Sequence, residues 1–238
     1  MIYIHKGNEP FELKKKRLEA KKKGLSPNEA YKTLSPSSKK KLKKILVSEQ
    51  GGLCAYCMCK IPRDDVDINI CPITIEHILP QIPNDATDVE QGLDYLNLVA
   101  VCNGNRASSC KNHKFCDLTC DAHKKNDVFL KINPTKAETL TSIYYTLYGE
   151  IESDDPDVKY DLQEILNLNS KGSPLVSERK AVLDTIIADM EYIDINSLST
   201  YCQSLLDEFQ NETDNKTPYV GIIIWYLNSM LEGLSISE

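Results

Sequence analysis

The sequence predicts an α+β protein that is mainly helical, with a small zinc-stabilised core between two helical regions. Helix-start signals recur in both flanks of the chain, whereas the segment between them has little helical periodicity. All the cysteines except Cys202 lie in that segment, which runs from Cys54 to Asn126. We therefore expect three parts: a basic helical N-terminal arm (residues 1–50), a zinc-bound core (51–130) and a C-terminal helical region packed on the core or on a partner (131–238).

The N-terminal arm contains three predicted helices. The first covers Lys14–Lys23 and ends at Gly24. The second begins with Ser26-Pro27-Asn28-Glu29, in which the serine caps the helix, the proline takes the first helical position and the glutamate reaches back to the cap. The third begins at Ser35-Pro36 and runs to Gln50, where two glycines stop it just before the cysteine-rich segment.

The C-terminal region carries several helix signals and no recognisable chemistry. The Thr135-Lys136-Ala137-Glu138 capping box predicts a helix to about Gly149, and Asp155-Pro156 starts another. The final helix, Pro218 to about Leu231, is apolar nearly all round, so we expect it to be buried in this chain or against a partner. Two amphipathic helices are expected before it, over Ser177–Ile193 and Asn196–Phe209.

Charge is distributed unevenly along the chain. Residues 1–50 hold 14 lysine and arginine residues against 5 acidic ones, a balance of +9. The balance is −3 over residues 51–126 and −13 over residues 127–238. A basic arm on an acidic body can hold a nucleic-acid backbone at one end of the molecule, although a solvated lysine-rich helix pair would have the same composition.

Several features favour a cytoplasmic protein with no membrane partner. The N-terminus turns polar within five residues, so we expect no secretory signal. The longest apolar run, Val220–Leu227, is too short to span a bilayer. In a reducing compartment, nine cysteines predict metal ligands and free thiols, not a disulfide framework.

Cys54 and Cys57 have the spacing of a zinc knuckle, in which a tight turn brings two thiolates to one tetrahedral ion. Cys102 follows a hydrophobic, strand-like run and is the expected third ligand. For the fourth ligand we favour Cys120 over Cys110, with the intervening residues looping out. A redox role for Cys54 and Cys57 is the alternative, but these residues lack the βαβ context of a thioredoxin-like motif.

The loop between the last two expected ligands has metal-ligand spacing of its own. A second zinc site there would use Cys110, His113 and Cys116, completed by Cys59 or Cys71. Buried or free thiols are the competing interpretation. Cys202 lies on a predicted helix face, where we expect it in the core.

An adjacent acid and histidine lie near the end of a strand-like run, Thr74–Pro80. A twist or bulge at the strand end would aim Glu76 at a metal ion and leave His77 free to take a proton from water. Asn97 stands just before a second strand-like run, Leu98–Val101, where a buried amide can tie the two strands together. The sequence therefore predicts a metal-assisted acid–base site.

Asp121 follows Cys120 directly, so zinc binding by Cys120 would place this carboxylate at the start of a helix. There it can serve with Glu76 as an oxygen ligand for a hard divalent cation such as Mg²⁺. His123 and Asn126 are its rivals for that role.

Two adjacent lysines close the cysteine-rich segment. We expect Lys124 and Lys125 to contact nucleic-acid phosphates. A solvated helix end is the competing interpretation of the same pair.

These elements resemble the HNH (ββα-metal) endonuclease family. The matching pieces occur in the family's order: Cys54-x-x-Cys57, Glu76-His77-Ile78-Leu79-Pro80, Asn97-Leu98, Cys102 and Cys120-Asp121-x-x-Lys124. The resemblance implies that His77 is the general base. It also implies that Glu76 and Asp121 bind the catalytic cation, and that Asn97 orients the loop of His77. The chain departs from the simplest pattern at Asp121, where the family often has histidine or asparagine, and in the long loop before Cys120.

Most of the chain also resembles the PtuB-type HNH proteins, through its lysine-rich N-terminus, Gln50–Cys57, and Leu166-Asn167-Leu168-Asn169 followed by Leu175 and Arg179. Those proteins accompany a PtuA-like ATPase in Septu and retron-associated antiphage systems, the latter with a reverse transcriptase and its RNA and DNA. The resemblance implies a nuclease effector with an ATPase partner, cutting DNA as first choice or RNA such as tRNA. The alternatives are a zinc-stabilised adaptor that binds nucleic acid or protein through a catalytically silent HNH fold, and a thiol redox protein.

Overall fold

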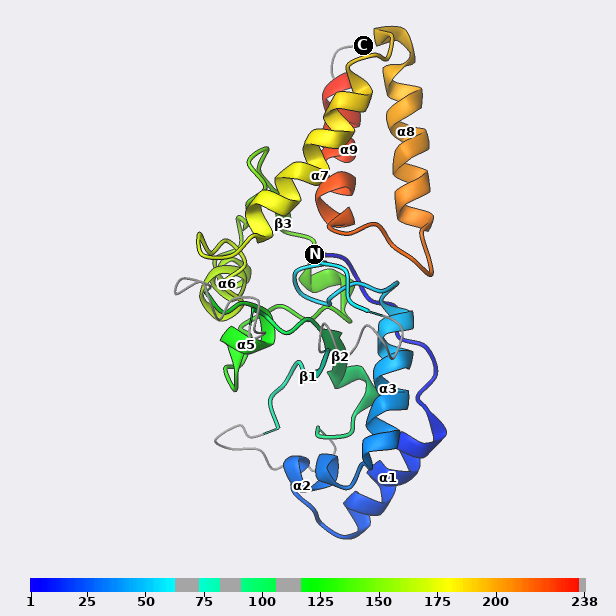
Figure 1. Cartoon of the computed structure of the whole chain (residues 1–238), viewed down its shortest axis with the longest axis vertical. Coiled ribbons are helices and arrows are strands. Elements are labelled where there is room, and N and C mark those ends of the chain that lie inside the picture. The colour runs from blue at the N-terminus through cyan, green and yellow to red at the C-terminus, as the bar shows by residue number, and fades with distance from the viewer. Residues whose placement is uncertain (63–72, 82–90, 106–116, 236–238) are drawn as a thin grey trace.

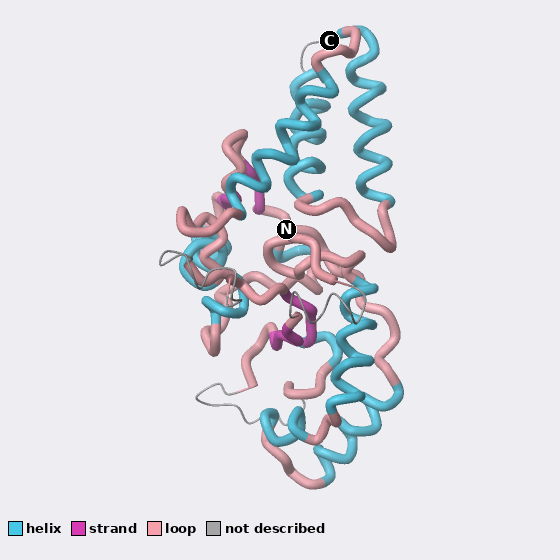
Figure 2. Tube along the Cα trace, in the orientation of Figure 1, coloured by secondary structure: helices cyan, strands magenta, loops and turns pink. Residues whose placement is uncertain are grey.

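The computed structural model describes residues 1–62, 73–81, 91–105 and 117–235. In this part of the chain the elements follow one another along the long axis of the molecule (Figure 1). Helices α1 to α3 form one end, two small sheets and short helices form the middle, and three long helices form the other end. Figure 2 shows that loops make up much of the middle. The described residues combine helices with two strand pairs, which confirms the α+β class.

The N-terminal arm folds into three helices, as predicted. They are α1 (Phe11–Lys22), α2 (Pro27–Lys32) and α3 (Pro36–Glu49). Ser26 and Glu29 form the predicted capping box, in which the Ser26 amide donates to the Glu29 carboxylate at 2.9 Å and the Glu29 amide donates to the Ser26 hydroxyl. Gly24 and Gly51 lie just beyond helix ends with φ angles of 63° and 65°, a conformation that favours glycine.

Two antiparallel strands and a short helix form the cysteine-rich core. Strand β1 (Thr74–His77) pairs with β2 (Leu98–Val101), so that Glu76 lies opposite Val99. Helix α5 (Cys120–Lys124) follows β2 along the described chain. Both strands and the start of this helix agree with the sequence prediction.

Helix α3 joins the arm to this core. It packs against β2, all of whose side chains are buried. Just beyond the helix, the Gln50 side chain donates to the Ala100 carbonyl and accepts from the Ala100 amide, both at 2.7 Å. Because these bonds satisfy buried backbone groups of β2, the arm is packed firmly on the core.

The structure contradicts the helix predicted from Thr135 to about Gly149. A short 3₁₀ turn, Ala137–Thr139, forms there instead, and a β-hairpin follows it. Strand β3 (Ile143–Tyr145) pairs with β4 (Ile151–Ser153), and Gly149 takes a φ of 88° in the connection. The isoleucine and two tyrosines of β3 favour a strand, and this preference overrides the capping-box pattern.

Three long helices form the far end of the molecule. Helix α6 (Pro156–Tyr160) and a π-helical segment (Asp161–Ile165) lead to α7 (Leu175–Met190), α8 (Ile195–Asn211) and α9 (Val220–Ser235). The apolar last helix is buried within this chain, as predicted, because it packs against α7, α8 and β3. Cys202 on α8 is also buried. Within the described ranges, none of the helices has the length and apolar content that a membrane crossing needs.

The first residues of the chain contact both the hairpin and the arm. The Met1 amino group donates to the Tyr145 hydroxyl, and the Ile4 amide donates to the Pro134 carbonyl at 2.8 Å. Lys6 then pairs with Glu49, at the end of α3, at 2.9 Å. The N-terminal segment therefore links helix α3 to the region that follows the core.

Candidate metal centre and catalytic cleft

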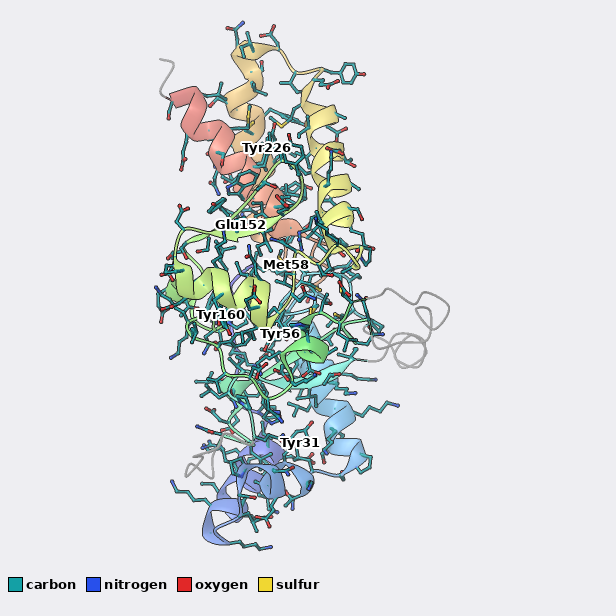
Figure 3. All side chains as sticks on the ribbon, turned by 90° about the vertical axis from the view of Figure 1, so that its left-hand side faces the viewer. Tyr31, Tyr56, Met58, Glu152, Tyr160 and Tyr226 are labelled. Carbon is teal, nitrogen blue, oxygen red and sulfur yellow. The ribbon has the colours of Figure 1, made fainter. Side chains whose placement is uncertain are left out.

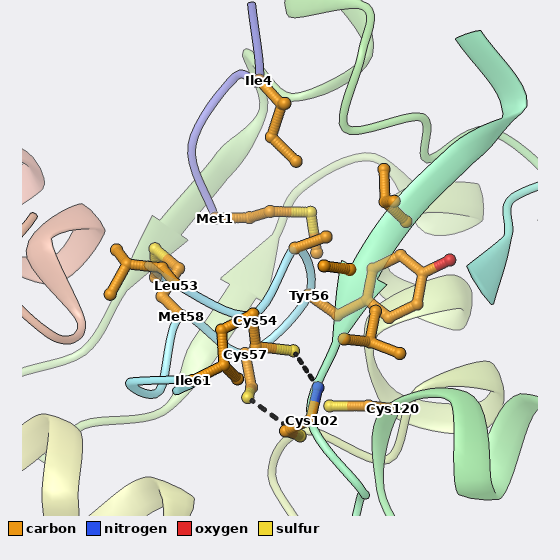
Figure 4. Close-up of a cluster of buried hydrophobic side chains, with 14 of the residues drawn as sticks. Met1, Ile4, Leu53, Cys54, Tyr56, Cys57, Met58, Ile61, Cys102 and Cys120 are labelled. Carbon is orange, nitrogen blue, oxygen red and sulfur yellow. Dashed lines mark hydrogen bonds between the residues drawn. The ribbon is translucent and has the colours of Figure 1, made fainter. Parts of the chain in front are cut away.

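The candidate metal centre is built on a tight turn near the middle of the molecule, where Figure 3 labels Tyr56 and Met58. The Met58 amide donates to the Cys54 carbonyl at 3.0 Å, and the Cys54 amide donates to the Cys59 carbonyl at 2.9 Å. Met58 takes a φ of 62°, which reverses the chain direction. The side chains of Cys54 and Cys57 then point toward Cys102 at the end of β2 (Figure 4).

Four thiols converge at this turn. The sulfur atoms of Cys54, Cys57, Cys59 and Cys102 all lie within 4.8 Å of one another. The Cys57 and Cys102 sulfurs are 3.8 Å apart, and the Cys102 amide donates to the Cys54 sulfur at 3.3 Å (Figure 4). A tetrahedral zinc ion with bonds of about 2.3 Å requires sulfurs about 3.8 Å apart. The four cysteines together could therefore hold an ion such as zinc.

Cys120 is a fifth thiol beside this group. It is fully buried and lies next to Cys102 in Figure 4. Hydrogen bonding to Cys102, Cys54 and Cys57 raises the pKa of the Cys120 thiol well above its usual value. The Cys59 sulfur lies within 4.8 Å of the same three thiols, and these neighbours raise the pKa of Cys59 well above its usual value. The structure thus places Cys59 in the group of four close thiols, and the predicted ligand Cys120 lies beside that group as a second candidate for the fourth position.

The structure corrects the expected grouping of Cys59. The sequence suggested Cys59 as a ligand of a second site in the later loop, but it belongs to the main cluster. The chain reversal at Met58 brings it back to Cys54, and the spacing of the cysteines does not reveal that reversal. The other residues of the suggested second site lie outside the described residues: Cys71, Cys110, His113 and Cys116.

The cluster favours a thiolate at Cys54. Burial opposes its ionisation, but hydrogen bonds from Cys102 and Cys120 outweigh burial and hold the pKa of Cys54 well below its usual value. The thiolate is the form of cysteine that binds metal. The ionised Cys54 sulfur can therefore bind a soft metal cation.

Glu76 is buried at the end of β1 among polar neighbours. The Lys124 ammonium lies 2.8 Å from Glu76 Oε1, and the Tyr56 hydroxyl donates to the same oxygen at 3.3 Å. Burial raises the pKa of Glu76 to about 8; the neighbouring Asp121 carboxylate adds to the rise, and Lys124 opposes it. Two acids in one buried site favour a bound cation, since the cation would stabilise the charge of both.

Lys124 is not placed where it can contact a phosphate, contrary to the sequence expectation. Its side chain is completely inaccessible, and its ammonium also donates to the His77 carbonyl at 3.3 Å. In this structure it compensates the charge of Glu76 and joins α5 to the end of β1. Lys125, in contrast, is exposed and lines the cleft described below.

The His77 ring is held in one orientation by its neighbours. Its Nε2 lies 3.1 Å from the Gly92 carbonyl, which assigns the proton to Nε2 and leaves the Nδ1 lone pair as the acceptor. The Gln81 amide nitrogen lies 2.9 Å from Nε2 and 3.1 Å from Nδ1, and the Tyr31 ring packs edge-on with centroids 4.8 Å apart. Burial lowers the pKa of His77 to about 4, so the ring is neutral near pH 7. A general base needs this protonation state.

Asn97 ties the loop after β1 to the segment before β2. Its amide nitrogen donates to the Leu79 and Gln91 carbonyls at 3.0 and 2.9 Å, and its oxygen accepts from the Leu79 amide at 2.7 Å. Leu79 follows His77 closely, and Gln91 precedes Gly92, which holds the imidazole. The Asn97 side chain thus lies where it can orient the His77 loop.

A cleft of about 190 Å³ opens beside these residues. Its lining includes Glu76, His77, Asp121, Lys125 and Asn126. His123 instead hydrogen-bonds through Nδ1 to the Ile165 carbonyl at 3.0 Å, in the C-terminal region. Of the two rivals of Asp121, Asn126 therefore lies beside the cleft and His123 is turned away from it.

Sequence reasoning missed three side chains that contact the candidate catalytic residues: Tyr31, Tyr56 and Gln81. Tyr56 lies inside the knuckle and Gln81 follows the Glu76–Pro80 motif. Their positions next to these motifs could have identified both as neighbours of the site. Tyr31 belongs to the arm, and nothing in the sequence connects it with His77. Its position depends on how α2 packs on the core.

Comparison with known proteins does not assign this chain to a family. No protein-family model matches it, and no curated protein sequence matches it. The functional interpretation therefore rests on the geometry of the cleft and on the resemblance of the motifs.

Proposed function

We propose that the chain is a metal-dependent endonuclease of the HNH type that hydrolyses phosphodiester bonds in nucleic acid. The observation that carries the proposal is the cleft in which a neutral His77 lies beside the Glu76 and Asp121 carboxylates. The order β1, β2, α5 with a cysteine cluster beside it supports the ββα-metal interpretation. DNA is our first choice of substrate. RNA such as tRNA is the second, because the cleft offers groups for phosphate and metal rather than for bases and therefore does not select against RNA.

In the proposed reaction His77 acts as the general base. Its Nδ1 takes a proton from a water molecule in the cleft, and the water oxygen attacks phosphorus opposite the departing 3′ oxygen. The Gly92 carbonyl accepts from Nε2 throughout, so it stabilises the imidazolium that forms. A base of this kind contributes about 10²- to 10⁴-fold to the rate.

Glu76 and Asp121 would hold the catalytic divalent cation, and their oxygen atoms suit Mg²⁺. Such a cation supplies stabilisation for the negative charge that develops on the phosphoryl group and the leaving oxygen. Lys124 and Tyr56 fix the Glu76 carboxylate through Oε1, which preorganises it. At the other site, Cys54, Cys57 and Cys102 with Cys120 or Cys59 would hold a structural zinc ion.

We propose further that the protein is the effector of an ATPase-linked antiphage complex of the Septu or retron-associated type. The motif resemblance supports this, as does the charge of −13 over residues 127–238, which suits a basic partner surface. Helix α9 buries one side within the chain, and Ile224, Trp225 and Tyr226 on it are half-buried. The proposed partners are a PtuA-like ATPase and, in a retron system, the reverse transcriptase with its RNA and DNA.

The test is a cleavage assay on plasmid DNA and total cellular RNA, with the purified chain alone and with its ATPase partner. We expect cutting that requires Mg²⁺ and that His77→Ala lowers by at least about 100-fold. His5→Ala is the matched control, because His5 is exposed and does not line the cleft. Mg²⁺-independent cutting, or equal activity in the two variants, would contradict the proposal.

An adaptor with a catalytically silent HNH fold is the second candidate. The buried pair of Lys124 and Glu76 favours it, because an internal ammonium already compensates one of the two proposed cation ligands. This candidate predicts that the zinc-loaded chain binds nucleic acid or a protein partner and cuts nothing under any of these conditions.

A further inference from the structure

We propose that the N-terminal arm supplies a phosphate-binding wall of the cleft, through Lys39 held in place by Tyr31; this inference rests on the proposed nuclease function. The arm reaches the cleft through α2, which carries Tyr31. The Tyr31 ring lines the cleft and packs on His77 at 86° with centroids 4.8 Å apart. An element outside the cysteine-rich core therefore forms part of the candidate site.

Lys39 is placed by the same aromatic ring. Its ammonium lies 4.2 Å from the Tyr31 ring centroid, within the range of a cation–π interaction. The side chain is half-buried on the first turns of α3, and its charge reaches His77 across the ring. Lys39 is not itself part of the cleft lining, but its ammonium is held on the ring of a residue that is.

A second cation belongs to the cleft lining itself. Lys125 follows α5, is exposed and lines the cleft together with Tyr31. A phosphate that approaches His77 must also approach the Glu76 and Asp121 carboxylates, which repel it. Cations from the arm and from the end of α5 would offset this repulsion and steer the backbone toward Nδ1 of His77.

Helix α3 offers a matched control two residues from Lys39. Lys41 is exposed on the same helix but lines a different cavity, of about 440 Å³, together with Phe11 and Leu42. Removal of Lys39 or of Lys41 changes the net charge equally. If Lys39→Met binds nucleic acid more weakly than Lys41→Met, Lys39 makes a specific phosphate contact. Equal affinities would mean that the two lysines contribute only to the overall positive charge of the arm.

The experiment measures binding in a His77→Ala background, so that no cutting interferes. The probes are a labelled DNA duplex of about 20 base pairs and a labelled RNA hairpin, titrated at several NaCl concentrations with Mg²⁺ present. For Lys39→Met we expect about fivefold weaker binding and a salt slope reduced by about 0.9 on the duplex, the value for one lost phosphate contact. Lys39→Arg and Lys41→Met should stay within about twofold of the reference, with zinc content confirming that every variant is folded.

The two proposals fail in distinguishable ways. Equal weakening by Lys39→Met and Lys41→Met, while the wild-type chain still cuts nucleic acid, overturns the role of Lys39 and leaves the nuclease proposal intact. If the reference protein binds neither probe and the wild-type chain cuts neither nucleic acid, both proposals are overturned. The proposal is supported if Lys39→Met weakens probe binding, Lys41→Met does not, and Lys39→Arg keeps the binding of the reference protein.

Discussion

His77 and Glu76 are neighbours in the chain, yet burial shifts their pKa values in opposite directions. It lowers the pKa of His77 to about 4 and raises that of Glu76 to about 8. Both shifts favour the neutral form, because a buried charge loses its hydration. Lys124 opposes the shift of Glu76, because its ammonium lies 2.8 Å from the carboxylate. Cation binding at Glu76 would favour the charged form further.

The His77 shift predicts a pH-dependent change in stability. Its folded pKa of about 4 lies below the ordinary value of 6.5, so the unfolded state binds more protons between these values and the folded state loses stability as the pH falls. His77→Gln removes this contribution. Between pH 7 and pH 5, the free energy of unfolding of the wild type should therefore fall by about 2 kcal/mol more than that of the variant, as measured by urea unfolding. Parallel falls in the two proteins would contradict a buried neutral imidazole.

Adjacent lysines give a second prediction at the same scale. Lys124 is fully buried against Glu76, whereas Lys125 is exposed. Lys124→Met should lower the free energy of unfolding by about 3 kcal/mol, because it leaves Glu76 buried without its partner, and Lys125→Met should change it by less than about 0.5 kcal/mol. The two variants carry the same change in net charge, so similar costs in urea unfolding would show that the buried pair is unimportant.

Three elements meet at the cysteine cluster: the knuckle turn, the end of β2 and helix α5. The turn contributes Cys54, Cys57 and Cys59, Cys102 follows β2, and α5 contributes Cys120. Because Cys59 belongs to the group of four close thiols and Cys120 lies beside that group, we propose that either one can complete a tetrahedral site. The link between zinc and α5 therefore depends on which of the two binds.

This arrangement predicts how zinc content responds to substitution. Cys59→Ser and Cys120→Ser should each keep about one zinc ion per chain after dialysis, and the double variant should lose most of it. Cys202→Ser is the control, since Cys202 is buried in α8 outside the cluster. Zinc is measured by atomic emission. Complete loss of zinc in one of the single variants would identify that cysteine as the sole fourth ligand and rule out a shared position.

At the scale of elements, local signals predicted the fold where the cause of the structure is local. The Ser26–Glu29 capping box formed as expected, because both of its hydrogen bonds lie within four residues. The similar pattern at Thr135 did not start a long helix, because the strand preference of Ile143–Tyr145 and its pairing with β4 decided the outcome. The strands β1 and β2 were predictable from short β-branched runs bounded by proline and polar residues.

The candidate site could be predicted in part, for the same reason. Glu76, His77 and Asp121 belong to motifs with fixed spacing, and the structure brings all three to one cleft. The contacts of Tyr31 and the pairing of Lys124 depend on packing between elements that are distant in sequence, so no spacing reveals them. Cys59 was misplaced because its position depends on the single chain reversal at Met58.

At the scale of the whole molecule, the cleft lies beside the basic end of the chain. The arm, with a balance of +9, borders the cleft through α2, and the three long helices of the acidic C-terminal region lie beyond the hairpin (Figure 1). Under the proposed function, a nucleic acid would therefore approach from the arm side. The sequence shows that the arm is basic, but only the fold shows that the arm packs beside the cleft.

The most direct test of the central claim is anomalous diffraction from crystals of the full chain soaked in Mn²⁺, which substitutes for Mg²⁺ and has its own absorption edge. The account predicts one manganese peak in contact with the carboxylates of Glu76 and Asp121, separate from a zinc peak at the cysteine cluster and lost in Asp121→Asn. A manganese peak elsewhere, or no peak beside these carboxylates at saturating Mn²⁺, would contradict it.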